Sequence, residues 1–480
     1  MQRGVTYMLA AVLLLGSCGG GGHEAPNQPD SRSLTLTGPS EALSWQQTAF
    51  TVQVSANFAY DVTFQEEWIT EDPDRRSTEF IRYFVAQENP NNWERSAEIR
   101  FTDHNDRYYS KVVTVTQGPN AAAKVSLSIV DKDATAQTKA LLANLWTLPD
   151  RGWMFGHHDD LWYGRFWYGD TGGSDTKAVC GDYPAVFSVD FADVMCNPSS
   201  SEMSIRRRVI LEARERGEVI MACIHVNNPK TGGDSWDNSS DQVVKEILTE
   251  GTDTRAKYIT WLDRLASFAN NLKDARGDLI PVLFRMYHEH TQGWSWWGSS
   301  CTTESDFIAF WRFTVQYLRD TKGVHNFLYA VSPQMDQIYP SALGRILYRW
   351  PGDDWVDYIG MDCYHGTWDD AFKANLEALD KASQNKRKPC GVTETGKEAF
   401  LETDFWTRHI LSPLEGHRVS MVTLWRNKYV GSNTEDTHYF SVFPGHPSED
   451  DFRALYDAER SLFSRDLPDM YTMPAGFEIK

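Results

Sequence analysis

The 480-residue sequence lacks several features that mark common classes of protein. No two of its seven cysteines are separated by two residues, which argues against zinc ribbons and thioredoxin-like redox sites. No HExxH motif occurs, so the helix-borne zinc site of metalloproteases is not expected. Basic residues number 47 against 66 acidic ones, and the net charge of −19 argues against nucleic acid and anionic membrane surfaces as partners.

Long uncharged apolar runs are scarce as well, and one of them lies at the N-terminus. The segment Val5–Leu15 follows Arg3 and is too short to span a bilayer, which is typical of a secretory signal. It leads into Leu15-Gly16-Ser17-Cys18, which resembles the lipobox of bacterial lipoproteins. This resemblance implies a lipoprotein signal peptide over residues 1–18, lipidation of Cys18, and export to the outer membrane of a Gram-negative-type bacterium, on its cell-surface or periplasmic face. An ordinary signal peptide is the alternative.

Aromatic residues, by contrast, are abundant. They make up 13% of the chain and include 18 tryptophans and 20 tyrosines. Flat aromatic rings pack against the apolar faces of sugars, so this excess favours a carbohydrate ligand, although large cores also use tryptophan. The chain is long enough for two or three domains.

Residues 19–33 hold glycine, proline, asparagine and aspartate without an apolar pattern and are expected to form a flexible tether. Residues 34–118 then alternate short apolar segments with turn residues, which predicts a small all-β sandwich. The expected strands are Leu34–Leu36, Phe50–Val54, Tyr60–Phe64, Phe84–Ala86, Ala97–Phe101 and Val112–Val115. Trp68, Asn89, Arg95–Ile99 and Gln117 occur in an order that resembles the BACON-type domain. The resemblance implies an immunoglobulin-like sandwich that serves first as a spacer.

Residues 119–132 are expected to be a linker, and residues 133–480 alternate apolar strands with amphipathic helices. The expected helices are Ala134–Trp146, Glu202–Arg216, Asp241–Leu272, Glu304–Leu318, Ala371–Ser383 and Glu449–Phe463. The expected strands are Gly152–Gly156, Pro184–Val189, Val219–His225, Leu279–Met286, Asn326–Val331, Val356–Met361, Pro389–Thr393 and Val419–Leu424. Eight strands interleaved with helices predict an α/β fold, the (β/α)8 TIM barrel. A doubly wound open sheet is the alternative, but no GxGxxG fingerprint follows the first strand.

The state of the six cysteines beyond Cys18 can be interpreted in two ways. In an oxidising compartment they can pair, and Cys180–Cys196 is the favoured local bridge. Several lie in or beside apolar strands, where a free buried thiol is equally expected.

Polar residues follow the expected strands at their C-terminal ends, where the active sites of such barrels lie. The residues at these ends are His157, His158, Asp190, His225, Asn227, Asn228, His288, Glu289, Asp362, Tyr364, Glu394, Trp425 and Arg426. A single switch from apolar to polar means little, because strand ends meet solvent. That seven of the eight strands end in such residues indicates that these side chains form one cluster at the C-terminal end of the barrel.

Two glutamates within this set, Glu289 and Glu394, emerge abruptly from apolar strands. Glycoside hydrolysis needs two carboxylates, one to protonate the leaving oxygen and one to attack the anomeric carbon or activate water. The acid needs a raised pKa, which apolar neighbours favour, so Glu289 beside the tryptophan-rich segment 294–297 suits that role. Glu394, with Tyr364 able to donate a hydrogen bond, suits the nucleophile.

The same region resembles glycoside hydrolase family 26, over about residues 133–463. The motifs that carry the resemblance are Phe155-Gly156-His157, His225 with Asn227, His288-Glu289 followed by Gly293-Trp294 and Trp296-Trp297-Gly298, Tyr364, Thr393-Glu394-Thr395-Gly396, and Leu424-Trp425. Members are (β/α)8 retaining hydrolases, chiefly endo-β-1,4-mannanases, with mannobiose-releasing, lichenase and β-1,3-xylanase members.

The resemblance implies roles for individual residues. Glu289 is the expected acid/base and Glu394 the expected nucleophile. Further expected substrate-site residues are His225, His288, Trp294, Tyr364, Trp425 and Trp236, with Trp425 as the platform for the sugar at −1. Of the three tryptophans Trp294, Trp296 and Trp297, we expect Trp294 alone to touch substrate. A monomer without cofactor or metal, acting on a polysaccharide that is first of all β-mannan, is expected.

Two rival functions come from other classes. A metal hydrolase would use His157, His158, Asp159, Asp160, His288 and His290 as ligands, and a chelator would then abolish its activity. A non-catalytic, lipid-anchored carbohydrate-binding protein is the second rival, although such a protein would be expected to have lost one of its carboxylates. If the protein is a glycoside hydrolase, a β-glucanase or β-1,3-xylanase on the same scaffold is the alternative to a mannanase.

Overall fold

The computed structural model describes residues 32–64, 66–91, 94–433 and 435–480. The predicted signal peptide with Cys18, and all but the end of the tether, lie outside the described residues. The chain separates into two compact units, the first ending at Ala123 and the second spanning Lys124–Lys480. Within the described ranges, no helix combines the length and apolar character needed to cross a bilayer.

The first unit is a two-sheet β-sandwich, as predicted. One antiparallel sheet has the order β1-β2-β5-β4 and the other the order β3-β6-β7. Their bounds are β1 Leu34–Thr37, β2 Thr48–Ala56, β3 Tyr60–Thr63, β4 Ile69–Glu71, β5 Ile81–Ala86, β6 Arg95–Asp103 and β7 Asp106–Gln117. Alternate residues of these strands face inward, and Val52, Phe84, Ile99, Phe101 and Val115 are fully buried between the sheets. The short strand β4 was not predicted.

The second unit is built on eight parallel strands that close on themselves. Their bounds are β9 Trp153–His158, β10 Val186–Asp190, β11 Val219–Cys223, β12 Val282–Arg285, β13 Phe327–Val331, β14 Tyr358–Cys363, β15 Cys390–Thr395 and β16 Met421–Leu424. Each strand pairs with the next in sequence, and β9 pairs with both β16 and β10. A closed sheet has no edges, so the (β/α)8 barrel is confirmed and the open doubly wound sheet is wrong.

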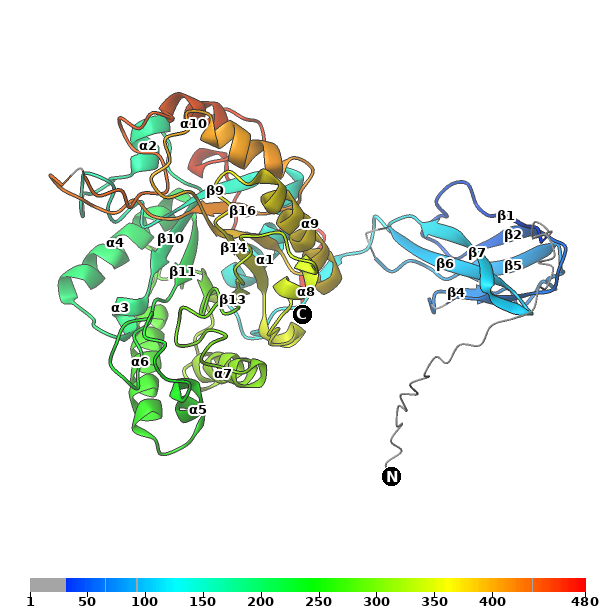
Figure 1. Ribbon diagram of the computed structural model, residues 1–480, viewed down its shortest axis with the longest axis horizontal. Helices are drawn as coiled ribbons and strands as arrows, with labels where there is room; N and C mark the ends of the chain where they lie inside the picture. Colours follow the sequence, from blue (N-terminus) through cyan, green and yellow to red (C-terminus); the bar gives the residue numbers. More distant parts are fainter. Residues whose placement is uncertain (1–31, 65, 92–93, 434) are drawn as a thin grey trace, which may run out of the picture. The chain divides into compact units, whose positions relative to one another are not determined.

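Helices surround this barrel on the outside (Figure 1). Their bounds are α1 Ala136–Thr147, α2 Asp175–Cys180, α3 Ala192–Met195, α4 Ser200–Arg216, α5 Val243–Leu248, α6 Asp253–Asn270, α7 Glu304–Gln316, α8 Ala342–Ile346, α9 Asp369–Lys386 and α10 Glu449–Tyr456. Several begin at a threonine whose hydroxyl accepts a backbone N–H, as Thr135 does for α1 and Thr303 for α7. Their apolar faces cover the barrel.

Two predicted helices are corrected by the structure. The single helix expected over Asp241–Leu272 is broken into α5 and α6, because Gly251 adopts a left-handed φ of 82° and Thr252 then caps a new helix. The helix expected to reach Phe463 ends at Tyr456, and Ser461–Leu462 forms strand β17 beside β9. Helical periodicity alone hides both breaks.

The predicted linker also contains regular structure. Strand β8 (Val125–Leu127) pairs in parallel with β18 (Phe477–Ile479), so the two ends of the second unit are hydrogen-bonded to each other. The N–H of Val130 donates to the Asp357 carboxylate, at 2.8 Å, which fixes the segment that follows β8. Part of the expected linker therefore belongs to the barrel unit.

The favoured Cys180–Cys196 bridge is wrong. All six cysteines of the described residues are free. The Cys180 thiol lies against the Thr176 carbonyl, whereas the Cys196 sulfur accepts the N–H of Asn227. The two side chains are held by different local partners, so proximity in sequence does not bring them together.

Candidate active site

Glu394 lies at the end of β15 and is almost completely buried, at 3% exposure. One of its carboxylate oxygens accepts a hydrogen bond from the Arg285 guanidinium, and the other accepts the Tyr364 hydroxyl at 2.8 Å. Arg285, at the end of β12, also donates to Asp362 at 2.7 Å. The Glu394 carboxylate is thus oriented by donors from two other strand ends, which suits a nucleophile that must meet one carbon atom.

Glu289 lies four residues beyond the end of β12 in an uncommon backbone conformation. Its φ is 52°, in the left-handed region that residues other than glycine rarely adopt, and its N–H donates to the Ser332 carbonyl at 2.8 Å. The indole N–H of Trp294 donates to the Glu289 carboxylate at 2.6 Å. Such strained positions cluster at functional sites, where surrounding structure imposes them.

The surroundings of Glu289 change its acidity. Burial in the cleft wall raises the pKa of Glu289 to about 7, and the negative charge of Glu394 acts in the same direction. The hydrogen bond from Trp294 opposes this rise. Glu289 therefore keeps its proton to near-neutral pH, as a general acid requires.

The two glutamates face each other across a short gap. One carboxylate oxygen from each of Glu289, Asp362 and Glu394 lies within 4.8 Å of the other two. Retaining glycosidases place their two carboxyl groups about 5 Å apart, whereas inverting enzymes leave a wider gap for water. The observed spacing fits direct attack by Glu394 on a sugar that Glu289 protonates.

A cavity of about 480 Å³ contains both glutamates, and we call it the catalytic pocket. All six predicted substrate-site residues line it, namely His225, Trp236, His288, Trp294, Tyr364 and Trp425. Trp236 is 63% exposed and its ring lies 4.5 Å from that of Trp294, so the two form an aromatic wall. This contact places Trp236 beside Trp294 at the catalytic pocket.

A second cavity, of about 700 Å³, continues the catalytic pocket, and we call it the adjoining pocket. The two share His225, Trp236, Trp425 and His438. The Trp425 ring stacks on His158 with centroids 4.3 Å apart, which holds it between the two cavities. The two cavities therefore meet at Trp425.

The tryptophan-rich segment 294–297 contains two fully buried tryptophans and one that is partly exposed. Trp296 and Trp297 are fully buried, and their indole N–H groups donate to the carbonyls of Val226 and His288. These two residues are structural supports. Trp294 alone of the three is partly exposed and lines the catalytic pocket.

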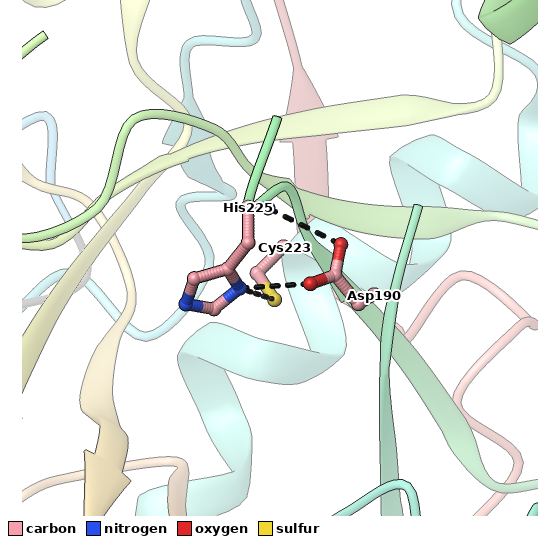
Figure 2. Close-up of side chains that lie close together, drawn as sticks. All are labelled: Asp190, Cys223 and His225. Atoms are coloured by element: carbon pink, nitrogen blue, oxygen red, sulfur yellow. Dashed lines mark hydrogen bonds and ion pairs between the residues drawn. The ribbon is translucent and has the colours of Figure 1, made fainter. Parts of the chain in front are cut away.

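Two clusters in the described part of the chain have spacing that could suit a metal ion. One is the trio of Glu289, Asp362 and Glu394, where the Arg285 guanidinium already bonds two of the three carboxylates. The other is Asp190, Cys223 and His225 (Figure 2), where Asp190 and His225 are directly hydrogen-bonded at 2.8 Å. Both clusters are thus satisfied by protein groups.

The ligand set of the predicted metal rival does not assemble. His290 does not line the catalytic pocket or the adjoining pocket. Its ring stacks on Phe307 with centroids 4.6 Å apart and lies against the Tyr348 carbonyl. His157 contacts Asp160 at 3.1 Å behind the barrel wall, where both are buried. These residues serve separate local networks.

Sequence reasoning missed several residues of the site. Lys397, Glu398, His438 and Phe440 line the catalytic pocket from the loops after β15 and β16. The imidazole of His438 and the carboxylate of Glu398 pair at 2.8 Å and join these loops. The unusual length of the loop after β16 was the available signal, but loop length does not identify the side chain that turns inward.

Comparison with known proteins agrees with this geometry. Residues 130–390, more than half of the chain, match the sequence profile described as glycosyl hydrolase family 26. A family 26 β-mannanase from Bacteroides ovatus is 38% identical with a TM-score of 0.66, covering 71% of this chain and 98% of its own. The catalytic domain of a family 26 endo-β-1,4-mannanase from Bacillus sp. JAMB-750 is 28% identical with a TM-score of 0.67, covering 75% and 100%.

Among curated proteins, a mannan endo-1,4-β-mannosidase from Bifidobacterium adolescentis is 28% identical over 390 residues. The match covers 75% of this chain but only 38% of that relative, which is much longer. The family profile, the solved structures and the paired glutamates at the ends of β12 and β15 converge, and the chain belongs to glycoside hydrolase family 26.

Proposed function

We propose that this protein is a retaining β-mannanase that cleaves β-1,4-mannosidic bonds in mannan, glucomannan or galactomannan by double displacement. The observation that carries the proposal is the pair Glu289 and Glu394, facing each other within 4.8 Å in a tryptophan-lined cleft. The relatives named above, whose names give β-mannan as the substrate, support this polysaccharide over others.

In the first step Glu394 attacks the anomeric carbon of the sugar at −1 while Glu289 gives its proton to the glycosidic oxygen. The leaving chain departs, and a covalent bond joins the sugar to Glu394. In the second step the Glu289 carboxylate takes a proton from water, which attacks the same carbon and releases Glu394. Tyr364 and Arg285 orient Glu394 throughout, and Trp425 supports the sugar at −1.

The two glutamates are tested by replacement. Glu394→Ala is expected to abolish hydrolysis of mannan, and Glu289→Ala to reduce it nearly to background, while both remain folded by circular dichroism. Glu289→Ala is expected to retain hydrolysis of an aryl β-mannoside with a good leaving group, because that group needs no proton. Normal mannan hydrolysis by either variant would overturn the assignment.

The substrate and the mode of cleavage are tested together. Products from galactomannan, glucomannan, lichenan and β-1,3-xylan are separated by chromatography, with mannooligosaccharides expected as the main products. Faster release from lichenan or β-1,3-xylan would instead support the β-glucanase or xylanase alternative. Binding of mannan without release of reducing ends would support the non-catalytic rival.

We further propose that the protein is an exported lipoprotein, held at the outer membrane through Cys18, with the sandwich as a spacer of the BACON type. The lipobox-like Leu15-Gly16-Ser17-Cys18 and the tether that follows it support this location. Replacement of Cys18 by alanine is expected to abolish palmitate labelling and membrane association in a bacterial host. Unchanged membrane association would contradict the anchor. The protein is proposed to act as a monomer, which sedimentation velocity tests.

A further inference from the structure

Asp190, at the end of β10, is held by three hydrogen bonds, of which two come from one residue. Its Oδ1 accepts the N–H of Ala192 at 2.7 Å and the N–H of His225 at 3.2 Å. Its Oδ2 accepts Nδ1 of the His225 ring at 2.8 Å (Figure 2). Because an ionised carboxylate only accepts hydrogen bonds, this contact places a proton on Nδ1 and fixes the ring orientation of His225.

His225 occupies the junction of the two cavities. It lines both the catalytic pocket and the adjoining pocket, and about a quarter of its side chain is exposed there. Its ring lies 5.5 Å from that of Trp425, the expected platform for the sugar at −1, and 4.4 Å from that of His288. Any sugar that rests on Trp425 is therefore within reach of His225.

The second ring nitrogen of His225 is free to bind a ligand. Nε2 points away from Asp190 and Cys223 in Figure 2, and it has no hydrogen-bond partner among the described residues. Nδ1, in contrast, is engaged by Asp190, with the buried Cys223 sulfur 3.8 Å behind it. The Asp190 contact thus leaves Nε2 as the available nitrogen of a residue that lines both cavities.

Charged and titratable groups from several strands face His225. Asp190 on β10 and Glu394 on β15 favour its protonated form, whereas Arg285 on β12 opposes it. Burial lowers the pKa of both His158 on β9 and His288, so these neighbours are neutral imidazoles. Burial also lowers the pKa of His225, but the charge of Asp190 and its hydrogen bond outweigh burial, and the pKa of His225 is raised.

We propose that Asp190 is a positioning residue: it fixes the His225 ring through Nδ1 and favours its protonated form, in which Nε2–H donates a hydrogen bond to a hydroxyl of the sugar bound beside Trp425. A charged donor makes a stronger hydrogen bond than a neutral one, so the protonated His225 ring orients the sugar hydroxyl without help from a further side chain. The inference rests on the proposed function, because the ligand is the polysaccharide chain in the cleft.

The experiment compares Asp190→Asn with Asp380→Asn. The control residue forms the same kind of pair outside the cleft, since Asp380 bonds Nδ1 of His417 at 2.7 Å and also accepts the N–H of Arg418. The full chain is used for KM and kcat on mannopentaose between pH 5 and pH 9. Binding of mannopentaose is measured by calorimetry in a Glu394→Gln background, and the His225 ring is titrated by NMR with labelled histidine.

Asp190→Asn is expected to raise KM, and the dissociation constant of mannopentaose, by about tenfold or more, because it weakens one charge-assisted hydrogen bond. The loss in kcat is expected to be smaller, and the titration midpoint of His225 is expected to move to lower pH. Wild-type affinity is expected to fall as pH rises through that midpoint. Asp380→Asn is expected to match the wild type in all four measurements.

An unchanged KM and pH profile in folded Asp190→Asn would overturn the inference. If that variant does not fold, proteins with Asp190 intact decide the question: His225 of the wild type titrating below the ordinary histidine value of about 6.5, or a His225 midpoint in Glu394→Gln that mannopentaose does not raise, would overturn it. Wild-type protein that neither binds nor cleaves mannopentaose would instead refute the proposed function. The two failures are therefore distinguishable.

Discussion

Glu289 and Glu394 are the same residue type in one cleft, yet their surroundings assign them different tasks. Glu394 is held from both sides by Arg285 and Tyr364, which orient its oxygens. The Glu289 carboxylate accepts one hydrogen bond, from the indole N–H of Trp294. Its burial in the cleft and the negative charge of Glu394 raise its pKa to about 7. The assignment of acid and nucleophile therefore rests on the contacts of each side chain.

The raised pKa of Glu289 predicts the alkaline limb of the activity profile. Glu289 is protonated below about pH 7 and loses its proton above, so kcat/KM on mannan is expected to fall as pH rises through about 7. Trp294→Phe removes a donor that stabilises the carboxylate, so the limb should move to higher pH even as the rate drops. Steady-state rates across pH measure both effects, and a limb that stays in place or moves down in Trp294→Phe would contradict them.

The same group links pH to stability. The pKa of Glu289 is higher in the folded protein than the ordinary glutamate value of about 4.3. Folding therefore takes up a proton between about pH 4.3 and pH 7, and the contribution of Glu289 to the free energy of unfolding is lost as pH rises through that window. Glu289→Gln removes this dependence.

At the scale of elements, the eight barrel strands were predictable because each is a short apolar run, and seven of them lead into the polar or aromatic residues named above. Both Glu289 and Glu394 could be placed at strand ends for that reason. The hydrophobic periodicity of a sequence does not show where a helix is interrupted. Such an interruption occurs at Gly251, a left-handed residue that separates α5 from α6. Strand β17 was missed because two residues carry no detectable alternation.

The pairings of Asp190 with His225 and of Arg285 with Glu394 were not predicted, although Tyr364 was expected to donate to Glu394 and does so. Asp190 and His225 were each recognisable as polar residues at strand ends, but their 2.8 Å pairing depends on the register of β10 against β11. Likewise Arg285 reaches Glu394, 109 residues further along the chain, only because the sheet closes. Residue spacing predicts which strand end carries a group, and the closed sheet decides which groups meet.

Substitution of Gly391 tests whether the close packing of strand β15 is needed to position Glu394. A Cβ atom at this position would overlap the Tyr358 hydroxyl and lie 2.8 Å from the Met421 carbonyl oxygen, inside the barrel. Gly391→Ala is expected to destabilise the fold by about 1–3 kcal/mol and to lower activity, since Glu394 lies three residues on. Thermal unfolding and specific activity measure this change.

The matched control for that substitution is Gly118→Ala. A Cβ atom there would lie 3.4 Å from the Leu43 carbonyl oxygen, an ordinary contact, in the first unit. It is expected to leave both measurements unchanged. Equal behaviour of the two variants would show that the barrel interior tolerates a methyl group at Gly391.

At the scale of the whole molecule, every residue that lines the two cavities belongs to the second unit. A protein consisting of residues 124–480 is therefore expected to hydrolyse soluble galactomannan with the kcat/KM of the full chain. Residues 133–480 should be less stable, because this shorter form loses β8 and its pairing with β18. Loss of activity in the 124–480 protein would mean that the sandwich contributes to catalysis.

The central claim is that Glu289 and Glu394 act as the acid and the nucleophile of a double displacement. Proton NMR of mannopentaose hydrolysis, recorded before the products equilibrate, observes the configuration of the newly formed reducing end directly. Two displacements at one carbon retain configuration, so the β anomer is predicted to appear first and to decay later towards the equilibrium mixture. First appearance of the α anomer would contradict the account.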